Sequence, residues 1–379
     1  MASFWLEEPA EPLPRRTLPG EPDVEIVGGG VTGCSCALAL AQAGLRVRLH
    51  EAREVAGGAS GRNGGFALRG GAIAYDQVRA QFGPEWARRY WELTERALER
   101  MAELAGDAFR QVGSLRLAVD EAEAADVRAE YDGLTSDGFE GDWLDAEDLP
   151  PSLRGRGRFA AGLFHPPDGA LQPARWVRRL ARAAVDAGAD LWEHSQVSSL
   201  DELSAARVVI ATDGYTHGLV PELDARIRPT RGQVIVTEPL PELVFDRPHY
   251  ARHGLEYWQQ MPDRRLVIGG WRDAVLDREF TDEETITPVV QERIEAGARD
   301  LLGHPPAITH RWAGLWGTTE DQLPLVGPLP ENERVWVAAG YSGHGNVLGF
   351  ACGELVGRAL AGDRDDAILD ALAPGRLTA

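Results

Sequence analysis

The sequence predicts two domains of different class, one α/β and one α+β. Near both ends of the chain, short apolar runs alternate with helical segments, which is typical of a parallel, doubly wound sheet. Between residues 231 and 271, β-rich segments follow one another directly, which favours a mostly antiparallel sheet. The length of 379 residues fits two domains, at roughly 150 residues per domain.

The first elements belong to the predicted α/β domain. A strand at Val24 to Val27 leads into a glycine-rich turn, a helix from Cys34 to Ala43 and a second strand from Leu45 to His50. A long helix is predicted over 76–104, because aromatic and aliphatic residues recur there along one side. We interpret these aromatic residues as core, with a cofactor-facing role as the alternative.

The remaining elements are predicted from apolar periodicity and from glycine and proline breaks. They are a strand at 112–119, an acidic surface helix at 121–131, a crossing between domains at 150–173, a helix at 174–187, strands at 191–197 and 208–210, strands at 233–237, 255–260 and 266–268, a helix at 287–301, a strand at 335–339 and a helix at 347–360.

The predicted domains are discontinuous in sequence. Residues 1–22 are expected to form an extended N-terminal arm, residues 23–105, 151–230 and 312–379 the α/β domain, and residues 106–150 and 231–311 the α+β domain.

The composition excludes several classes of protein. The net charge of −20 would repel a phosphate backbone, so nucleic acid is not an expected partner. All 39 Lys or Arg positions hold Arg, which rules out Schiff-base and P-loop lysines. Cys34, Cys36 and Cys352 match neither a metal site nor a disulfide framework and fit a cytoplasmic location. No apolar run approaches the roughly 18 residues that a membrane span needs.

A glycine motif carries the first chemical signal. Gly28, Gly30 and Gly33 lie between the first strand and the first helix, in the spacing that brings backbone N–H groups to a pyrophosphate. Glu51 ends the next strand 18 positions after Gly33, where an acid accepts hydrogen bonds from ribose hydroxyls. The motif predicts dinucleotide binding, with a structural glycine turn as the alternative.

Three further segments favour FAD over NAD as the dinucleotide. Residues 57–65 hold five glycines with Ser60, Arg62 and Asn63, and can wrap a phosphate and a polar ring, although a flexible loop is the alternative. The strands at 208–210 and 335–339 both run into small residues. A single ligand that touches all four segments must be long, and FAD meets that requirement.

These segments resemble the FAD-dependent oxidoreductases of the D-amino-acid oxidase and sarcosine oxidase superfamily, and most resemble gamma-glutamylputrescine oxidase-like proteins. The resemblance is carried by Gly28 to Gly33, Gly58 to Gly65, Ala211 to Thr216, Arg228 to Gln233, Trp312 to Gly327 and Gly340 to Gly345. It implies a discontinuous, Rossmann-like FAD-binding domain and a mostly antiparallel substrate domain that covers the flavin. It also implies hydride transfer from an amine-bearing carbon to flavin N5, hydrolysis of the imine, and flavin reoxidation by O₂.

Together the motifs and the resemblance predict the cofactor site. FAD is expected to contact Gly28, Gly30, Val31, Thr32, Gly33, Glu51, Ala52, Ala59, Ser60, Arg62, Asn63, Gly64, Gly65, Val197, Ala211, Thr212, Gly214, Gly314, Gly340, Gly343, His344, Gly345 and Asn346.

Departures from sarcosine oxidases are as informative as matches. The position of their flavin-linking cysteine holds Gly314, so FAD is expected to be non-covalent. Their carboxylate-gripping lysine falls near Val347, and their oxygen-activating lysine near Val267. A pocket histidine is replaced by Trp271. These differences argue against a sarcosine-type substrate.

Candidates for substrate contact and catalysis are Arg69, Tyr257 and Trp271. Arg69 lies where related enzymes keep a carboxylate-binding arginine, with a solvated surface position as the alternative. Tyr257, Trp258 and Trp271 lie on the predicted sheet of the substrate domain and could be either pocket wall or core. We interpret six other histidines as structural, namely His165, His217, His249, His253, His304 and His310.

The expected function is oxidation of a small-molecule amine by a flavoenzyme, with O₂ or another electron acceptor. Two alternatives remain at this point. One is an FAD-dependent amino-acid dehydrogenase that passes electrons to a quinone or a protein. The other is a flavin-binding subunit without turnover of its own.

Overall fold

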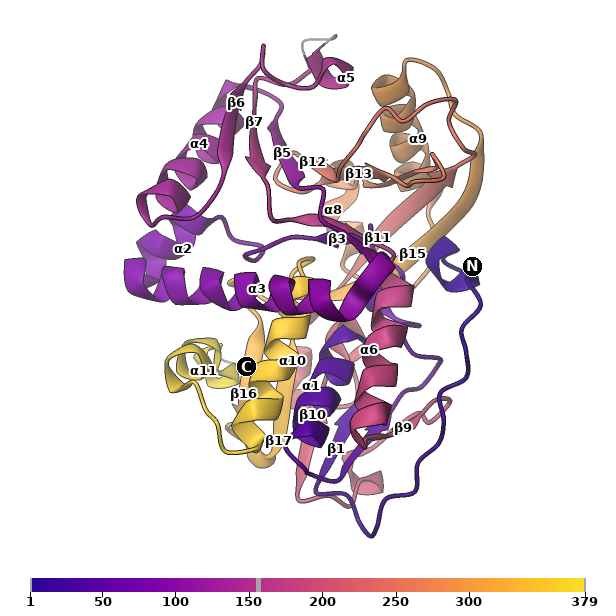
Figure 1. The fold of residues 1–379 in the computed structure, drawn as a ribbon, viewed down its shortest axis with the longest axis vertical. Helices are drawn as coiled ribbons and strands as arrows, with labels where there is room; N and C mark the ends of the chain where they lie inside the picture. Colours follow the sequence, from indigo (N-terminus) through magenta and orange to yellow (C-terminus); the bar gives the residue numbers. More distant parts are fainter. Residues whose placement is uncertain (1, 155–157, 378–379) are drawn as a thin grey trace.

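Two large sheets organise the chain in the computed structural model, which describes residues 2–154 and 158–377 (Figure 1). The first sheet has the order β16-β17-β10-β1-β2-β9. Its strands are β1 (Val24–Val27), β2 (Val47–His50), β9 (Asp190–Trp192), β10 (Arg207–Ile210), β16 (Leu325–Leu329) and β17 (Asn332–Ala339). All neighbours are parallel except β16 and β17, so this is the predicted α/β sheet.

Three helices pack side by side on this sheet: α1 (Val31–Gln42), α6 (Pro173–Ala187) and α10 (Val347–Leu360). Small residues bring α1 and α10 together, because a Cβ on Gly353 would lie 2.2 Å from the carbonyl oxygen of Thr32. The three cysteines are free and buried, two of them in α1 and one in α10.

The second sheet has the order β15-β11-β14-β13-β12-β5-β7-β6. Its strands are β5 (Ser114–Ala118), β6 (Asp142–Asp145), β7 (Ala161–His165), β11 (Arg228–Thr237), β12 (His249–Ala251), β13 (Glu256–Gln260), β14 (Leu266–Gly270) and β15 (Ile308–Thr318). Its neighbours are antiparallel except β5 and β12, as expected for the substrate domain. A small third sheet joins β3 (Phe66–Ala67), β8 (Gly169–Leu171) and β4 (Phe109–Arg110).

The remaining helices surround the two sheets. They are α2 (Tyr75–Phe82), α3 (Pro84–Ala105), α4 (Glu121–Ser136), α5 (Pro151–Arg154), α7 (Pro221–Asp224), α8 (Leu276–Glu279), α9 (Pro288–Leu302) and α11 (Asp366–Leu372). In Figure 1, α3 lies across the junction between the halves that contain the two large sheets. No helix in the described ranges is long and apolar enough to cross a membrane.

Three features differ from the sequence predictions. The helix predicted over 76–104 is two helices, because Gly83 has φ +84° and Pro84 begins α3. Strand β7 and the last residues of β15 belong to the second sheet, although the predicted boundaries assign residues 151–230 and 312–379 to the α/β domain. Helix α4 buries Glu123 and Glu130 and so is more than an acidic surface helix.

The N-terminal arm crosses both halves of the molecule. A short 3₁₀ helix at Phe4–Glu7 buries Trp5, and extended chain then follows α6 toward β1. Along this path the Glu8 carboxylate accepts hydrogen bonds from Arg175, and the Glu8 carbonyl accepts one from Arg178.

Candidate functional site

A cavity of about 1290 Å³ lies between the two large sheets. One wall is formed by loops that follow β1, β2, β10 and β17. These loops meet at the carboxyl ends of the parallel strands. Ligands of open α/β sheets bind at this edge. The opposite wall comes from the second sheet, and the far end from α2, α4, β5 and β7.

The first glycine turn is shaped by close backbone contacts. Gly28 has φ +112°, and a Cβ there would lie 2.5 Å from the carbonyl oxygen of Ala211. A Cβ on Gly33 would lie 1.9 Å from the carbonyl oxygen of Gly28, so Gly33 permits the close packing of α1 on β1. At the start of α1, the Val31 N–H donates to the Ser60 hydroxyl oxygen at 2.9 Å.

Glu51 is fixed beside this turn by two backbone donors. Its carboxylate accepts from the N–H of Gly29 at 2.6 Å and from the N–H of Arg53 at 2.7 Å. Burial raises the pKa of the Glu51 carboxyl, and the two N–H groups oppose that shift by stabilising the charged form. The carboxylate is therefore held at the end of β2, as the spacing predicts.

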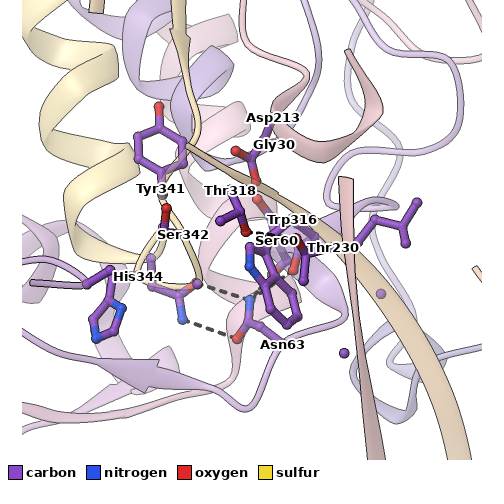
Figure 2. Close-up of a pocket in the computed structure, with 18 of the residues that line it drawn as sticks. Gly30, Ser60, Asn63, Asp213, Thr230, Trp316, Thr318, Tyr341, Ser342 and His344 are labelled. Atoms are coloured by element: carbon purple, nitrogen blue, oxygen red, sulfur yellow. Dashed lines mark hydrogen bonds between the residues drawn. The ribbon is translucent and has the colours of Figure 1, made fainter. Parts of the chain in front are cut away.

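The second glycine loop, Gly57 to Gly65, is joined to the last glycine turn by a reciprocal amide pair. Asn63 Nδ2 donates to Asn346 Oδ1 at 3.1 Å, and Asn346 Nδ2 donates to Asn63 Oδ1 at 3.1 Å. Figure 2 shows Asn63 with its dashed contacts in the same close-up as Ser342 and His344. This pair fixes two loops that are 283 positions apart in the sequence.

Asp213 joins three segments at the cavity wall, a role that the sequence patterns do not single out. Its carboxylate accepts from the N–H of Gly340 at 2.8 Å and from the N–H of Gly317 at 3.0 Å. Burial raises the pKa of Asp213, and these donors oppose the shift. The Ala-Thr-Asp-Gly segment after β10 was the available signal, but the partners of Asp213 lie more than a hundred positions away.

His344 lies in the last glycine turn, facing the cavity (Figure 2). Its Nδ1 is buried and has no hydrogen-bond partner in the described ranges. Burial, with a smaller effect of the Arg116 guanidinium, lowers the pKa of His344 to about 4. The imidazole is therefore neutral near pH 7 and leaves a polar atom for a ligand to satisfy.

The arrangement fits FAD. Glycines let the segments that line the cavity approach one another closely, since a Cβ on Gly30 would lie 2.9 Å from Ser60 Oγ and one on Gly64 would lie 2.9 Å from the Tyr257 ring. Nineteen of the predicted cofactor residues line the cavity, and Gly33, Gly65, Gly214 and Gly340 instead allow close packing behind it. The lining members are Gly28, Gly30, Val31, Thr32, Glu51, Ala52, Ala59, Ser60, Arg62, Asn63, Gly64, Val197, Ala211, Thr212, Gly314, Gly343, His344, Gly345 and Asn346.

Arg69 lines the cavity but is tied to protein acceptors. Its guanidinium donates to Asp168 at 3.1 Å, to Glu95 at 2.5 Å and to the carbonyl of Glu140 at 3.3 Å. Because its side chain is 1% exposed, the surface alternative is wrong. These hydrogen bonds fix the position of Arg69 in the cavity wall. A role of Arg69 in holding a substrate carboxylate stays a prediction.

Of the three aromatic candidates, Tyr257 alone lines the cavity in the described ranges. Its ring lies edge-on to Phe66 at 5.8 Å, and burial raises its pKa to about 12, so the hydroxyl stays protonated. Trp271 is a correction: its indole packs into the core, where a Cβ on Gly297 would lie 2.3 Å from it. Trp258 is also core and stacks on His249 at 5.4 Å.

Several lining residues were not singled out as site residues by the sequence analysis. Arg272 lies over the Trp316 ring at 4.9 Å, and Arg116 and Tyr250 lie on adjacent strands of the second sheet. His165, which was interpreted as structural, also lines the cavity. A charged residue between Leu115 and Leu117 in a predicted strand was the available signal for Arg116. Among described residues, no cluster of His, Cys, Asp or Glu is placed to hold a metal ion.

Comparisons with known proteins agree with this geometry. The chain matches the family described as DAO, FAD dependent oxidoreductase, over residues 23–359. It is 29% identical over 375 residues to the probable oxidoreductase OrdL of Rhizobium meliloti (strain 1021), covering 92% of this chain and 85% of that protein. It is 28% identical over 368 residues to gamma-glutamylputrescine oxidoreductase of Escherichia coli (strain K12), covering 90% and 84%.

The fold is likewise shared with a solved structure. The crystal structure of glycine oxidase from Geobacillus kaustophilus superposes with a TM-score of 0.78 at 24% identity, covering 95% of this chain and 100% of that one. The resemblance inferred from the glycine segments and the prediction of FAD as the cofactor are thereby confirmed. The chain belongs to the DAO family of FAD-dependent oxidoreductases.

Proposed function

We propose that the protein oxidises a primary or secondary amine of the gamma-glutamylputrescine type. One observation carries the proposal: the cavity continues past the glycine loops along Tyr257 and Tyr250 to Arg116. Its volume of about 1290 Å³ exceeds the roughly 300–1,000 Å³ of ordinary small-ligand sites. The space suits a cofactor together with an elongated substrate. The similarity to gamma-glutamylputrescine oxidoreductase supports the same substrate class.

The chemistry divides between cofactor and chain. Bound FAD supplies a hydride acceptor. The amine loses a hydride from its α-carbon and a proton from nitrogen, and water hydrolyses the resulting imine to a carbonyl compound and ammonia or a smaller amine. The chain orients the amine and excludes water, and the protonated Tyr257 hydroxyl can donate to an acceptor atom.

The residues of the glycine turns and of the end of β2 indicate how the chain would hold the cofactor. Glu51 would accept hydrogen bonds from ribose hydroxyls, and the glycine turns at Gly28 to Gly33 and Gly343 to Gly345 would present backbone to the ligand. The three free, buried cysteines fit the reducing cytoplasm that we propose as its location.

Anaerobic reduction of the flavin tests the function. Gamma-glutamylputrescine, putrescine, sarcosine, glycine and D-alanine should be mixed with enzyme without O₂ while flavin absorbance is recorded. We expect gamma-glutamylputrescine to bleach the flavin faster than sarcosine or D-alanine. Bleaching by sarcosine alone would reverse the substrate ranking, and no bleaching by any amine would favour a non-catalytic flavin-binding subunit. Reoxidation in air then separates an oxidase from a dehydrogenase.

A further inference from the structure

A row of side chains crosses the second sheet on the face that lines the cavity. Tyr257 of β13 pairs with Tyr250 of β12, and Tyr250 pairs with Arg116 of β5. Directly paired residues project to the same face of a sheet, and all three line the cavity. Because neighbouring strands lie about 4.8 Å apart, Arg116 is roughly 10 Å from Tyr257. The row leads from the glycine loops to the far end of the cavity.

Arg116 brings unused hydrogen-bond donors to this end. The residue is 9% exposed, and Glu130 accepts the single hydrogen bond that its guanidinium makes within the described chain. Its Nε is buried and has no hydrogen-bond partner among the residues that the structure describes. A guanidinium carries five N–H donors, and a carboxylate matches their geometry best. The wall therefore presents a buried cation with capacity for an anionic oxygen.

Asp76, at the start of α2, brings an unused acceptor to the same end. Its Oδ1 is buried without a partner in the described ranges, and the residue lines the cavity with Glu130 and Asp126 of α4. Burial and the neighbouring Glu130 carboxylate raise the pKa of Asp76. The same effects would make an incoming ammonium group favourable, because it would neutralise an excess of negative charge.

His165 shows that this end is enclosed by the protein. It is 3% exposed, lines the cavity, and has an Nδ1 without a hydrogen-bond partner among described residues. Burial and the guanidinium groups of Arg69 and Arg116 lower the pKa of His165 well below its usual range, so the ring is neutral. Three polar atoms of this wall are buried without a partner among the described residues, which is costly, and a small rotation of these side chains would bring them to a ligand in the cavity.

We propose that this end binds the zwitterionic head group of an α-amino acid carried by the substrate. Arg116 donates to the carboxylate and Asp76 accepts from the ammonium, while the amine to be oxidised lies near Tyr257. The inference rests on the proposed function, because it assigns the other end of the same substrate. A purely anionic head group would meet Asp76 and Glu130, and a purely cationic one would meet Arg116.

A binding experiment tests the head group without turnover. Gamma-glutamyl butylamide has the zwitterion but no terminal amine to oxidise. Two analogues lack one charge each: glutaric acid monobutylamide lacks the ammonium, and 4-amino-4-methyl-N-butylpentanamide lacks the carboxylate and has no C–H bond beside its amine that could be oxidised. Titration calorimetry on the FAD-loaded enzyme should show that each deletion weakens binding about tenfold or more.

Two variants test which residues bind the ammonium and the carboxylate of the head group. Asp76→Asn should weaken gamma-glutamyl butylamide about tenfold, whereas glutaric acid monobutylamide should bind as well as before or more tightly, since that analogue has no ammonium and loses a repelling carboxylate. Asp132→Asn, on the exposed side of α4, is the matched control and should change neither. Arg116→Gln combined with Glu130→Gln removes the buried pair together and should abolish the preference for a carboxylate.

The outcomes separate this inference from the proposed function. Equal affinity of the wild-type enzyme for the three amides, or equal loss for all three in Asp76→Asn, would overturn the head-group site. If the amides bind as expected while no amine bleaches the flavin, the head-group site stands and amine oxidation fails. If amines bleach the flavin but the amides do not discriminate, the reverse holds.

Discussion

The indole N–H of Trp5 donates to the main-chain carbonyl oxygen of Asn63 at 2.8 Å, across 58 positions of sequence. Trp5 is 1% exposed, and the Asn63 side chain in turn accepts from the N–H of Gly65 at 2.8 Å. The N-terminal arm therefore forms part of the wall behind the second glycine loop. A segment that the sequence presents as an extended arm supports the cofactor site.

Trp5→Phe should weaken FAD binding by about 2- to 13-fold, because a net hydrogen bond contributes about 0.5–1.5 kcal/mol. The substitution keeps an aromatic ring but leaves the Asn63 carbonyl without its donor. Titration of apoprotein with FAD, followed by quenching of flavin fluorescence, measures the dissociation constant. Glu11→Gln is the control, since Glu11 is exposed on the same arm and contacts Arg182 of α6. Equal dissociation constants for Trp5→Phe and wild type would contradict this role.

FAD should be released when the protein is denatured. Gly314 stands where a flavin-linking cysteine would lie, and a Cβ there would be 2.8 Å from Arg62 Cβ, so even a small side chain would be crowded. No histidine occurs between Glu51 and Gly71 as an alternative attachment point. Acid precipitation should leave a colourless pellet and yellow supernatant. A pellet that stays yellow after washing in acid would refute the prediction.

Glu51→Gln should weaken FAD binding by about 10- to 150-fold. Charge-assisted hydrogen bonds contribute about 1.5–3 kcal/mol, and the amide retains the size of the side chain without its charge. The variant should purify partly as apoprotein and show a raised FAD dissociation constant. Glu54→Gln, an exposed neighbour on the same loop, should bind FAD like wild type. Unchanged flavin occupancy in Glu51→Gln would remove Glu51 from the ribose site.

Stability should fall in mild acid because His249 is buried in neutral form. Burial lowers the pKa of His249 to about 3, whereas an unfolded histidine titrates near 6.5. Between these values the unfolded chain binds a proton that the folded chain does not. The free energy of unfolding therefore decreases as pH falls from about 6.5 toward 3, by up to about 1.4 kcal/mol per pH unit for this residue.

Urea unfolding of the FAD-loaded enzyme at pH 7.5, 6.0 and 5.0 measures that slope. His249→Gln should be less stable at pH 7.5, because the side chain stacks on Trp258 in the core. Its stability should nevertheless depend less steeply on pH than that of the wild type. The same slope in both proteins would show that His249 does not titrate on unfolding.

The sequence predicts the parts of the site that local chain chemistry determines. Gly28, Gly33 and Glu51 follow from spacing along one strand, turn and helix; in the structure Gly28 and Glu51 line the cavity, and Gly33 lies behind it and lets α1 pack on β1. Trp271 was placed wrongly because β14 ends at Gly270 and the chain turns at Trp271, where φ is +51°, so that the indole packs into the core. Arg116 and Asp76 come together through sheet order and helix packing, which depend on contacts distant in sequence.

Helix α4 also shows that contacts distant in sequence limit what the sequence can predict. A run of acidic residues usually indicates a solvated face, yet Glu130 of α4 is buried because Arg116 pairs with it. Glu123 is buried because the N–H groups of Val119 and His253 donate to its carboxylate. None of these partners is predictable from α4 itself, since the groups that satisfy the buried carboxylates come from other segments of the chain.

The last prediction concerns O₂. Its first reduction product is an anion, which a fixed cation in an enclosed cavity stabilises. The resemblance to sarcosine oxidases implies an oxygen-activating lysine near Val267, but this chain has no lysine. Of the cations expected from sequence, Arg62 is paired with Glu284 at 3.2 Å, Arg265 donates to the Thr237 carbonyl outside the cavity lining, and His344 is neutral.

Arg272 is the better candidate for this role. It lines the cavity over Trp316 and makes no side-chain hydrogen bond or ion pair with a described residue. Dithionite-reduced enzyme mixed rapidly with air-saturated buffer should reoxidise measurably, and Arg272→Gln should slow this about tenfold or more. Arg265→Gln should react like wild type. Because dithionite replaces the amine, a role of Arg272 in substrate binding cannot produce the effect. Equal rates in all three proteins would exclude Arg272, and complete inertness of the wild type would favour the dehydrogenase.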